Sequence, residues 1–439
     1  MIKFTETILR DGQQSLIATR MKIEDILPAL EKMDNLGYHS IEMWGGATFD
    51  SCLRYLDEDP WLRLSKINMR VKNTSLQMLL RGQNILGYKH YPDDVLEKFI
   101  ARSIDNGISI IRIFDALNDI RNIKKSIQYT NKYGAHAQGT IVYTTSPIHN
   151  IEHYVDTARS LQEIGADSIC LKDMAGLLTP YKCYKLIKKL KKELDIPIQL
   201  HSHNTSGMAF MTYLKGIEAG VDIIDTAISP FSSGTSQPTT ETMLATLTGT
   251  DYDPGINLKK VDELSAYFHE IRNKYSDYLG TFEVDPRVIT YQLPGGMLSN
   301  LHNQLKEQGM LDKYNDVLKE VPRVRKDMGY PPLVTPTSQI VGTQAVFNVI
   351  SGERYSLVSS ETREYVRGMY GRPPGEIDNN IKEKILGDKE QITERPGDLI
   401  PSRFAETLDS IKDFVTKEED VLSYILFPEI AEEFLKKHY

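Results

Sequence analysis

One short pattern occurs four times along the chain: a glycine at a helix-to-strand junction, followed at once by a short apolar strand. Glycine commonly ends a helix, because it adopts the left-handed backbone conformation without a steric penalty. The four junctions are Leu36-Gly37-Tyr38, Asn106-Gly107-Ile108, Ile164-Gly165-Ala166 and Ala219-Gly220-Val221. A chain that repeats this pattern alternates helices with strands.

The intervals between the junctions leave room for one further strand and two helices each. Strand patterns occupy residues 2–9, 71–78, 135–143 and 196–203, which brings the predicted number of strands to eight. Amphipathic helices are predicted at residues 23–34, 94–106, 151–163 and 180–194. Strands joined through helices pair in parallel by right-handed crossovers. We therefore expect a (β/α)₈ TIM barrel, with an open doubly wound sheet as the alternative.

Beyond about Pro254 the alternation of strands and helices stops. Helical patterns follow, for example over residues 258–278, and two or three further helices are predicted over residues 404–439. We expect a barrel domain over residues 1–265 and a mostly helical C-terminal domain over residues 266–439 that completes the active site.

Composition narrows the class of protein. The chain is 40% hydrophobic and 26% charged, and no apolar run reaches the roughly 20 residues needed to cross a bilayer. Its net charge of -8 argues against a nucleic-acid partner. Residues 1–7 lack the apolar core of a signal peptide, and Cys52, Cys170 and Cys183 have no ligand spacing. These features predict a cytoplasmic protein.

Candidate functional residues follow the predicted strands, where the strand-to-helix loops of a barrel form its active face. Alternate side chains of a strand share a face, so His201 and His203 can converge on one metal ion. Asp11, at the end of the first strand, would add a carboxylate, and this ligand set suits Zn²⁺ or another divalent ion. The alternative for Asp11 is a helix cap.

Lys172 lies in the sixth predicted strand, on the metal side of the barrel. A metal ion would repel its ammonium group, so Lys172 either points elsewhere or has lost its charge, for example by carbamylation with CO₂. Arg81 is a candidate for bidentate binding of a substrate carboxylate, with a surface ion pair as the alternative. Gln14 could donate to a carbonyl or enolate oxygen, or make a loop hydrogen bond. Thr335 could pass a proton, or be an extended residue before a proline.

Several motifs together resemble the carboxyltransferase component of the biotin-dependent enzymes that act on pyruvate and oxaloacetate. This family includes the α subunit of oxaloacetate decarboxylase, the B subunit of pyruvate carboxylase and the pyruvate-handling subunit of transcarboxylase. The resemblance extends to about Pro401. The motifs are residues 7–15 with 18–21, Leu79-Leu80-Arg81-Gly82, residues 171–176, His201-Ser202-His203, residues 234–238 and, in the second region, residues 334–342.

The resemblance implies a role for each candidate residue. A divalent ion, most simply Zn²⁺ with Mn²⁺ or Co²⁺ as alternatives, would be held by Asp11, His201, His203 and a carbamylated Lys172. The keto acid would be bound by Arg81, Gln14 and Arg10. The Thr335 hydroxyl would relay a proton between biotin and the enolate of pyruvate, whose developing charge requires fixed positive charge nearby.

Two departures from the family pattern refine the expected function. Gln339 stands where the multidomain pyruvate carboxylases carry a lysine, and the sequence has no biotin-acceptor domain. The main interpretation is therefore an oxaloacetate decarboxylase α subunit that converts oxaloacetate and biotin to pyruvate and carboxybiotin. A separate carrier protein would supply biotin, unless the sequence is truncated. The family also implies a homodimer, and a membrane decarboxylase subunit is a further candidate partner.

Three alternatives remain open for the function. The first is the carboxyltransferase subunit of pyruvate carboxylase or transcarboxylase, which runs from pyruvate to oxaloacetate. The second is a metal-dependent aldolase or acyl-CoA lyase or synthase of the same barrel superfamily, which would not use a lysine ligand from the sixth strand. The third is a barrel that binds ligands without catalysis.

Overall fold

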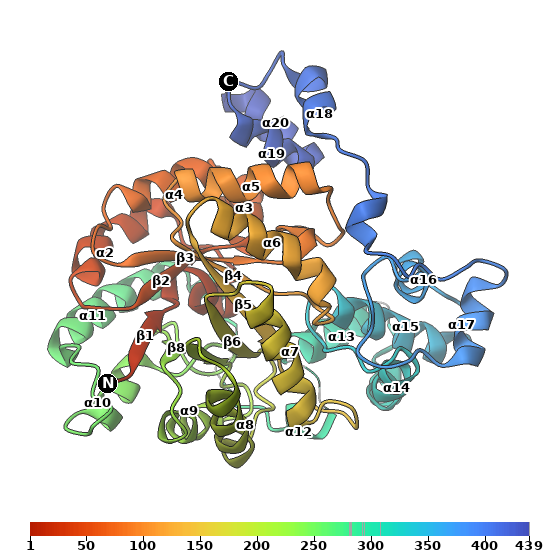
Figure 1. The fold of residues 1–439 in the computed structure, drawn as a ribbon, viewed down its shortest axis with the longest axis horizontal. Helices are drawn as coiled ribbons and strands as arrows, with labels where there is room; N and C mark the ends of the chain where they lie inside the picture. Colours follow the sequence, from red (N-terminus) through yellow and green to blue (C-terminus); the bar gives the residue numbers. More distant parts are fainter. Residues whose placement is uncertain (281–282, 292, 294, 308, 439) are drawn as a thin grey trace.

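The computed structural model describes residues 1–280, 283–291, 293, 295–307 and 309–438. Eight parallel strands follow one another around a closed ring, and β8 pairs back with β1 (Figure 1). This confirms the predicted TIM barrel and excludes the open sheet. The strands are β1 (Lys3–Glu6), β2 (Ser40–Trp44), β3 (Ser75–Leu80), β4 (Ile110–Ile113), β5 (His136–Val142), β6 (Ser168–Asp173), β7 (Ile198–Ser202) and β8 (Ile223–Thr226).

The junction glycines end helices as the sequence predicts. Their φ angles are +87° at Gly37, +116° at Gly107, +99° at Gly165 and +100° at Gly220. Residues with a side chain rarely adopt this backbone conformation. Four helices match their predicted ranges to within one residue at each end, because their apolar residues recur with the helical period. They are α2 (Ile23–Asp34), α5 (Asp93–Asp105), α7 (Ile151–Glu163) and α8 (Pro180–Glu193).

The remaining helices of the barrel complete its outer layer and its rim. Strand-to-helix connections contain a π-helical turn at Ile8–Gly12 and a 3₁₀ turn at Gly82–Asn84, and a second π-helical turn, Cys52–Leu56, lies between two helices. The remaining α-helices of the barrel are α1 (Gln13–Ile17), α3 (Gly46–Ser51), α4 (Pro60–Asn68), α6 (Ile120–Lys132), α9 (Ala209–Glu218), α10 (Thr240–Leu247) and α11 (Leu258–Lys274).

A second, helical region follows the barrel and has its own hydrophobic core, which includes Val321, Val324, Ile340 and Tyr365. Figure 1 shows this region beside the barrel, at the right of the view. Its helices are α12 (Arg287–Tyr291), α13 (Gly295–Glu307), α14 (Tyr314–Asp327), α15 (Thr337–Ser351), α16 (Ser360–Arg367) and α17 (Asn379–Leu386).

The last three helices, α18 (Phe404–Ile411), α19 (Glu418–Leu426) and α20 (Pro428–His438), return to the barrel and lie beside α4 and α5 (Figure 1). The Trp61 indole donates a hydrogen bond of 3.0 Å to Ser423 Oγ, and the rings of Phe49 and Phe427 stack at 5.7 Å. Residues beyond 265 therefore contribute to two hydrophobic cores, that of the second region and that of the barrel. Across the described residues, no helix has the length and hydropathy to span a membrane.

Candidate metal centre

Three candidate ligands converge where β1 and β7 end. Asp11 lies in the π-helical turn after β1, His201 lies in β7, and His203 follows directly. Asp11 Oδ2 is 3.3 Å from His201 Nε2 and 3.4 Å from His203 Nε2, and the three ligand atoms lie within 4.8 Å of one another. Ligand atoms about 2.1 Å from a tetrahedral Zn²⁺ are roughly 3.4 Å apart, so this donor set fits a single divalent ion.

The hydrogen bonds behind the two histidines set their tautomers. His203 Nδ1 is 2.6 Å from the carbonyl oxygen of Thr235, and His201 Nδ1 is 2.6 Å from Asp225 Oδ2. A carbonyl or carboxylate oxygen can only accept, so each Nδ1 carries the hydrogen and each Nε2 keeps its lone pair. Both lone pairs are therefore available on the side where Asp11 lies, which is the arrangement that metal-binding histidines require.

Lys172, from β6, points into the same site. Its Nζ is 2.9 Å from His201 Nε2 and 3.7 Å from Asp11 Oδ2, and the residue is only 1% exposed. Burial lowers the pKa of Lys172 from its usual value. Burial alone would raise the pKa of Asp11, but Arg10, His203 and Lys172 hold it well below its usual range. The site therefore presents a carboxylate, two imidazoles and the terminal nitrogen of Lys172.

Arg10 lies at this centre but is bound to protein carboxylates. Its Nη2 donates to Asp11 Oδ2 at 2.8 Å, its Nε donates to Glu42 Oε1 at 2.5 Å, and the residue is 2% exposed. The first of these contacts shares Asp11 Oδ2 with the two histidines. Arg10 thus contacts a candidate metal ligand directly.

Sequence reasoning missed a charged network inside the barrel. Arg112 from β4 donates a bidentate pair to Asp225 from β8 and also lies 3.0 Å from Glu42 Oε2 in β2, and all three are fully buried. The Gln199 side chain donates to Asp225 Oδ1 at 2.5 Å. The signal was present, because each charged residue interrupts a short apolar strand, as in Ile110-Ile111-Arg112-Ile113.

Two of the candidate substrate and catalytic residues line a narrow cavity between the barrel and the second region. Arg81 follows β3 and Thr335 precedes α15, and both line this cavity with Asn84, His90 and Asp115. The guanidinium of Arg81 donates to the carbonyl oxygens of Leu86 and Gly87 at 3.0 and 3.1 Å.

Gln14 is half-buried in α1, the short helix that begins directly after the turn containing Asp11. Its neighbour Gln13 is fully buried, and the Gln13 amide is occupied by the backbone of Leu9 and Met21. Of the two adjacent glutamines, Gln14 is therefore the one with the more accessible side chain.

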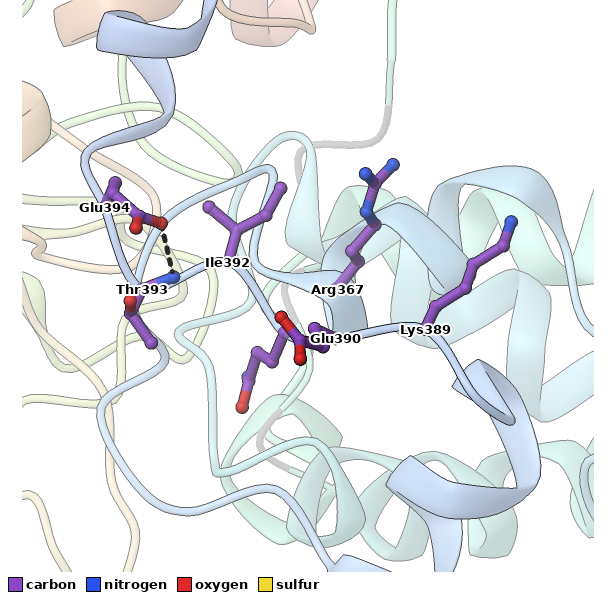
Figure 2. Close-up of a pocket in the computed structure, with 7 residues that line it drawn as sticks. Arg367, Lys389, Glu390, Ile392, Thr393 and Glu394 are labelled. Atoms are coloured by element: carbon purple, nitrogen blue, oxygen red, sulfur yellow. Dashed lines mark hydrogen bonds between the residues drawn. The ribbon is translucent and has the colours of Figure 1, made fainter.

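A larger hollow of about 480 Å³ lies on the second region, between the end of α16 and the chain that follows α17 (Figure 2). Figure 2 shows the side chains of Arg367 and Lys389 on its rim, with Glu390 and Glu394 nearby. None of the residues that line it belongs to the candidate ligand or substrate set. This hollow therefore shares no lining residue with the candidate site at the barrel mouth.

Comparison with known proteins identifies relatives over almost the whole chain. Residues 110–267 match an HMGL-like family model, and residues 288–439 match a conserved carboxylase domain. The B subunit of pyruvate carboxylase from Methanocaldococcus jannaschii is 57% identical over 99% of this chain and 78% of that protein. The methylmalonyl-CoA carboxyltransferase 5S subunit of Propionibacterium freudenreichii subsp. shermanii is 46% identical over 99% of this chain and 87% of that protein.

A solved structure has the same fold. The carboxyl transferase domain of Rhizobium etli pyruvate carboxylase, in complex with pyruvate and biocytin, matches with a TM-score of 0.93 and 32% identity. The match covers 99% of this chain and 76% of that chain.

Proposed function

The chain belongs to the biotin-dependent carboxyltransferase family, and from this premise we propose that it transfers a carboxyl group from carrier-borne biotin to pyruvate, which yields oxaloacetate. The observation that carries this proposal is the 57% identity to the B subunit of a pyruvate carboxylase across 99% of the chain. A metal-type donor set at the barrel mouth supports it.

The main interpretation from the sequence was an oxaloacetate decarboxylase α subunit, and the comparisons favour its alternative instead. That interpretation depended on the missing biotin-acceptor domain and on Gln339, which is an exposed residue whose amide is 3.4 Å from Thr335 Oγ1. This contact can orient the Thr335 hydroxyl, but it does not determine the direction of the reaction. We therefore propose carboxylation of pyruvate as the forward reaction.

The metal would be held by Asp11, His201 and His203, with Lys172 as the fourth ligand after carbamylation. When bound, a divalent ion supplies fixed positive charge against the negative charge that develops on the keto acid. Carbamylation would join the neutral Lys172 amine to CO₂ and release one proton, so that an anionic carbamate takes the place of the amine. The 3.7 Å between Lys172 Nζ and Asp11 Oδ2 supports this assignment, since it places the Lys172 side chain beside another candidate ligand.

The remaining steps depend on side chains of this protein. Arg81 and Gln14 would bind the carboxylate and the keto oxygen of pyruvate and keep the methyl carbon in a fixed position. The Thr335 hydroxyl would accept a proton from that methyl carbon and donate its own to the ureido nitrogen of biotin. The carboxyl group leaves that nitrogen and bonds to the methyl carbon, so atoms and charge balance.

The proposed partners follow from the same premise. A biotin carrier protein would deliver the carboxyl group, two copies of the chain would form a homodimer, and the protein would act in the cytoplasm. Pyruvate and oxaloacetate are the proposed small-molecule substrates.

A direct test uses the purified chain with carboxylated carrier protein and pyruvate, and oxaloacetate is measured by coupled reduction with NADH. We expect oxaloacetate to form only when all three components are present. In the reverse direction, free biotin should stimulate decarboxylation of oxaloacetate. If biotin has no effect and the protein instead cleaves an acyl-CoA, the lyase alternative is correct and this proposal is wrong.

A further inference from the structure

Arg395 connects the chain that leaves the second region to the loop that carries Arg81. It lies just before the 3₁₀ turn Pro396–Leu399, on the segment between α17 and α18, and its side chain is 10% exposed. Figure 1 shows this segment running along the side of the barrel toward the C-terminal helices. Gln83, one of its partners, is 312 residues away in the sequence.

Every N–H donor of the Arg395 guanidinium has an acceptor. Nη2 donates to Gln83 Oε1 at 2.6 Å and to Asp93 Oδ1 at 2.5 Å. Nη1 donates to Asp93 Oδ2 at 3.2 Å and to Asp398 Oδ1 at 2.5 Å, and Nε donates to the carbonyl of Arg121 at 3.2 Å. A lysine has three donors on a single nitrogen and cannot reproduce this planar set of five.

Gln83 transmits this contact to the loop between β3 and α5. Its own amide donates to the carbonyl of Tyr91 at 2.6 Å, and the backbone N–H of Tyr91 donates to the Gln83 carbonyl at 3.0 Å. The two ends of the 83–91 segment are thus fixed to each other. Within that segment lie Leu86 and Gly87, whose carbonyls bind the Arg81 guanidinium.

Gly397 shows how closely this contact is packed. A Cβ at Gly397 would lie 2.8 Å from Arg395 Nη2 and 3.1 Å from Gln83 Cδ, both closer than normal contacts. The absence of a side chain at residue 397 is therefore what allows the guanidinium and the amide to meet. This observation is independent of the hydrogen bonds.

The segment before Arg395 is also attached to the barrel. Arg121 of α6 donates to the carbonyl of Thr393 at 2.7 Å, and the backbone N–H of Ile392 donates to the Arg367 carbonyl at 2.8 Å. Figure 2 shows residues 389–394 passing beside Arg367 at the end of α16. Arg395 is consequently held from the second region on one side and from the barrel on the other.

We propose that Arg395 is a positioning residue for pyruvate binding: through Gln83 it fixes the loop that orients Arg81, and so sets Arg81 opposite Thr335 in their shared cavity. This inference rests on the proposed function, in which Arg81 binds the keto acid. It assigns Arg395 no contact with the substrate itself.

The test compares Arg395→Lys and Arg395→Ala with a matched control, Arg367→Ala. Arg367 is an arginine of the second region that makes a loose ion pair of 3.8 Å with Glu364. We expect KM for pyruvate to rise roughly tenfold in both Arg395 variants, with kcat changed less than about threefold, because the loop that binds the substrate is misplaced. The control should match the wild type in both parameters.

Hydrogen–deuterium exchange gives a second readout that does not need activity. Amides of residues 84–91 should exchange faster in Arg395→Lys, while those of the barrel strands keep their wild-type protection. If the wild type is inactive toward pyruvate but this change appears, the proposed function fails and the connection from Arg395 to the loop stands. Wild-type exchange in the loop, or an unchanged KM in an active enzyme, would overturn the inference.

Two further variants keep the test decisive if Arg395→Ala does not fold. Gly397→Ala should displace the guanidinium from Gln83 and raise KM for pyruvate with Arg395 still present. Gln83→Ala combined with Arg395→Lys should be no worse than the more affected single variant, since both act through one contact. Fully additive effects on KM would contradict a shared path.

Discussion

Asp225 and His201 form a hydrogen bond of 2.6 Å between Oδ2 and Nδ1 inside the barrel, and Arg112 donates to both oxygens of the same carboxylate. Burial alone would raise the pKa of Asp225, but Arg112 and His201 hold it below its usual range. The carboxylate therefore stays charged and keeps the hydrogen of His201 on Nδ1, which leaves the Nε2 lone pair beside Asp11 and Lys172.

Asp225→Asn should weaken metal binding by about 10- to 100-fold, because an amide does not enforce this tautomer. The variant also removes the negative charge that pairs with the buried Arg112 guanidinium, so the free energy of unfolding should fall by about 3 kcal/mol. Metal titration after chelation and thermal melting measure the two effects. Asp195→Asn, in an exposed loop, is the control. Wild-type metal affinity in Asp225→Asn would show that the tautomer is fixed by other groups.

Lys172→Ala should abolish carboxyl transfer, because the site loses the side chain proposed to become an anionic ligand. The same variant should lose the carbamate signal expected by ¹³C NMR after incubation with ¹³CO₂. Lys188→Ala, on the exposed face of α8, should retain both activity and signal. Full activity in Lys172→Ala would reject the assigned role and favour an enzyme without a lysine ligand.

Thr335→Ala should lower kcat by about 10²- to 10⁴-fold, the range typical of a lost proton-transfer group. KM for pyruvate should change little, since Arg81 and Gln14 are intact. Thr335→Ser keeps the hydroxyl and should recover most of the rate. Steady-state kinetics separate these effects, and equal rates for the alanine and serine variants would remove Thr335 from the proton path.

Asp115 should make stability depend on pH. Burial, followed by the charge of Asp119, raises the pKa of Asp115 from 3.8 to about 7. Between these values the folded protein holds a proton that the unfolded chain has released. The free energy of unfolding should therefore fall as pH rises from about 4 to about 7, and this contribution should be lost above that range.

Asp115→Asn cannot ionise, so its melting temperature relative to the wild type should increase from pH 5 to pH 7.5. A constant offset is expected as well, because the amide nitrogen cannot accept the hydrogen bond that Asn122 donates at 3.1 Å. Parallel melting curves for the two proteins across this pH range would assign the dependence to another group.

The sequence predicts features that depend on neighbouring residues. Junction glycines such as Gly107 and the helical periodicity of α2 are local, so the eight strands and four helices follow from them. The proximity of Asp11, Lys172, His201 and His203 also follows, because the carboxyl ends of barrel strands meet at one face. Their catalytic roles remain predictions.

Long-range pairing could not be predicted in the same way. Glu42, Arg112 and Asp225 each look like a single charge in an apolar strand, and only the closed ring brings them together. The contact between Arg395 and Gln83 spans 312 residues and has no local pattern. The packing of α19 against the barrel could not be predicted from periodicity either. Periodicity shows that a helix has an apolar face, but it does not show which element that face packs against.

The C-terminal helices pack against the barrel through Ser423 on Trp61 and Phe427 on Phe49. This packing has a consequence for folding during synthesis. Trp61 is translated about 360 residues before Ser423, so this aromatic surface has no cover from α19 until late in synthesis. Over that interval the surface is open to aggregation or to binding by chaperones. Docking of α19 and α20 against the barrel is the event that covers it.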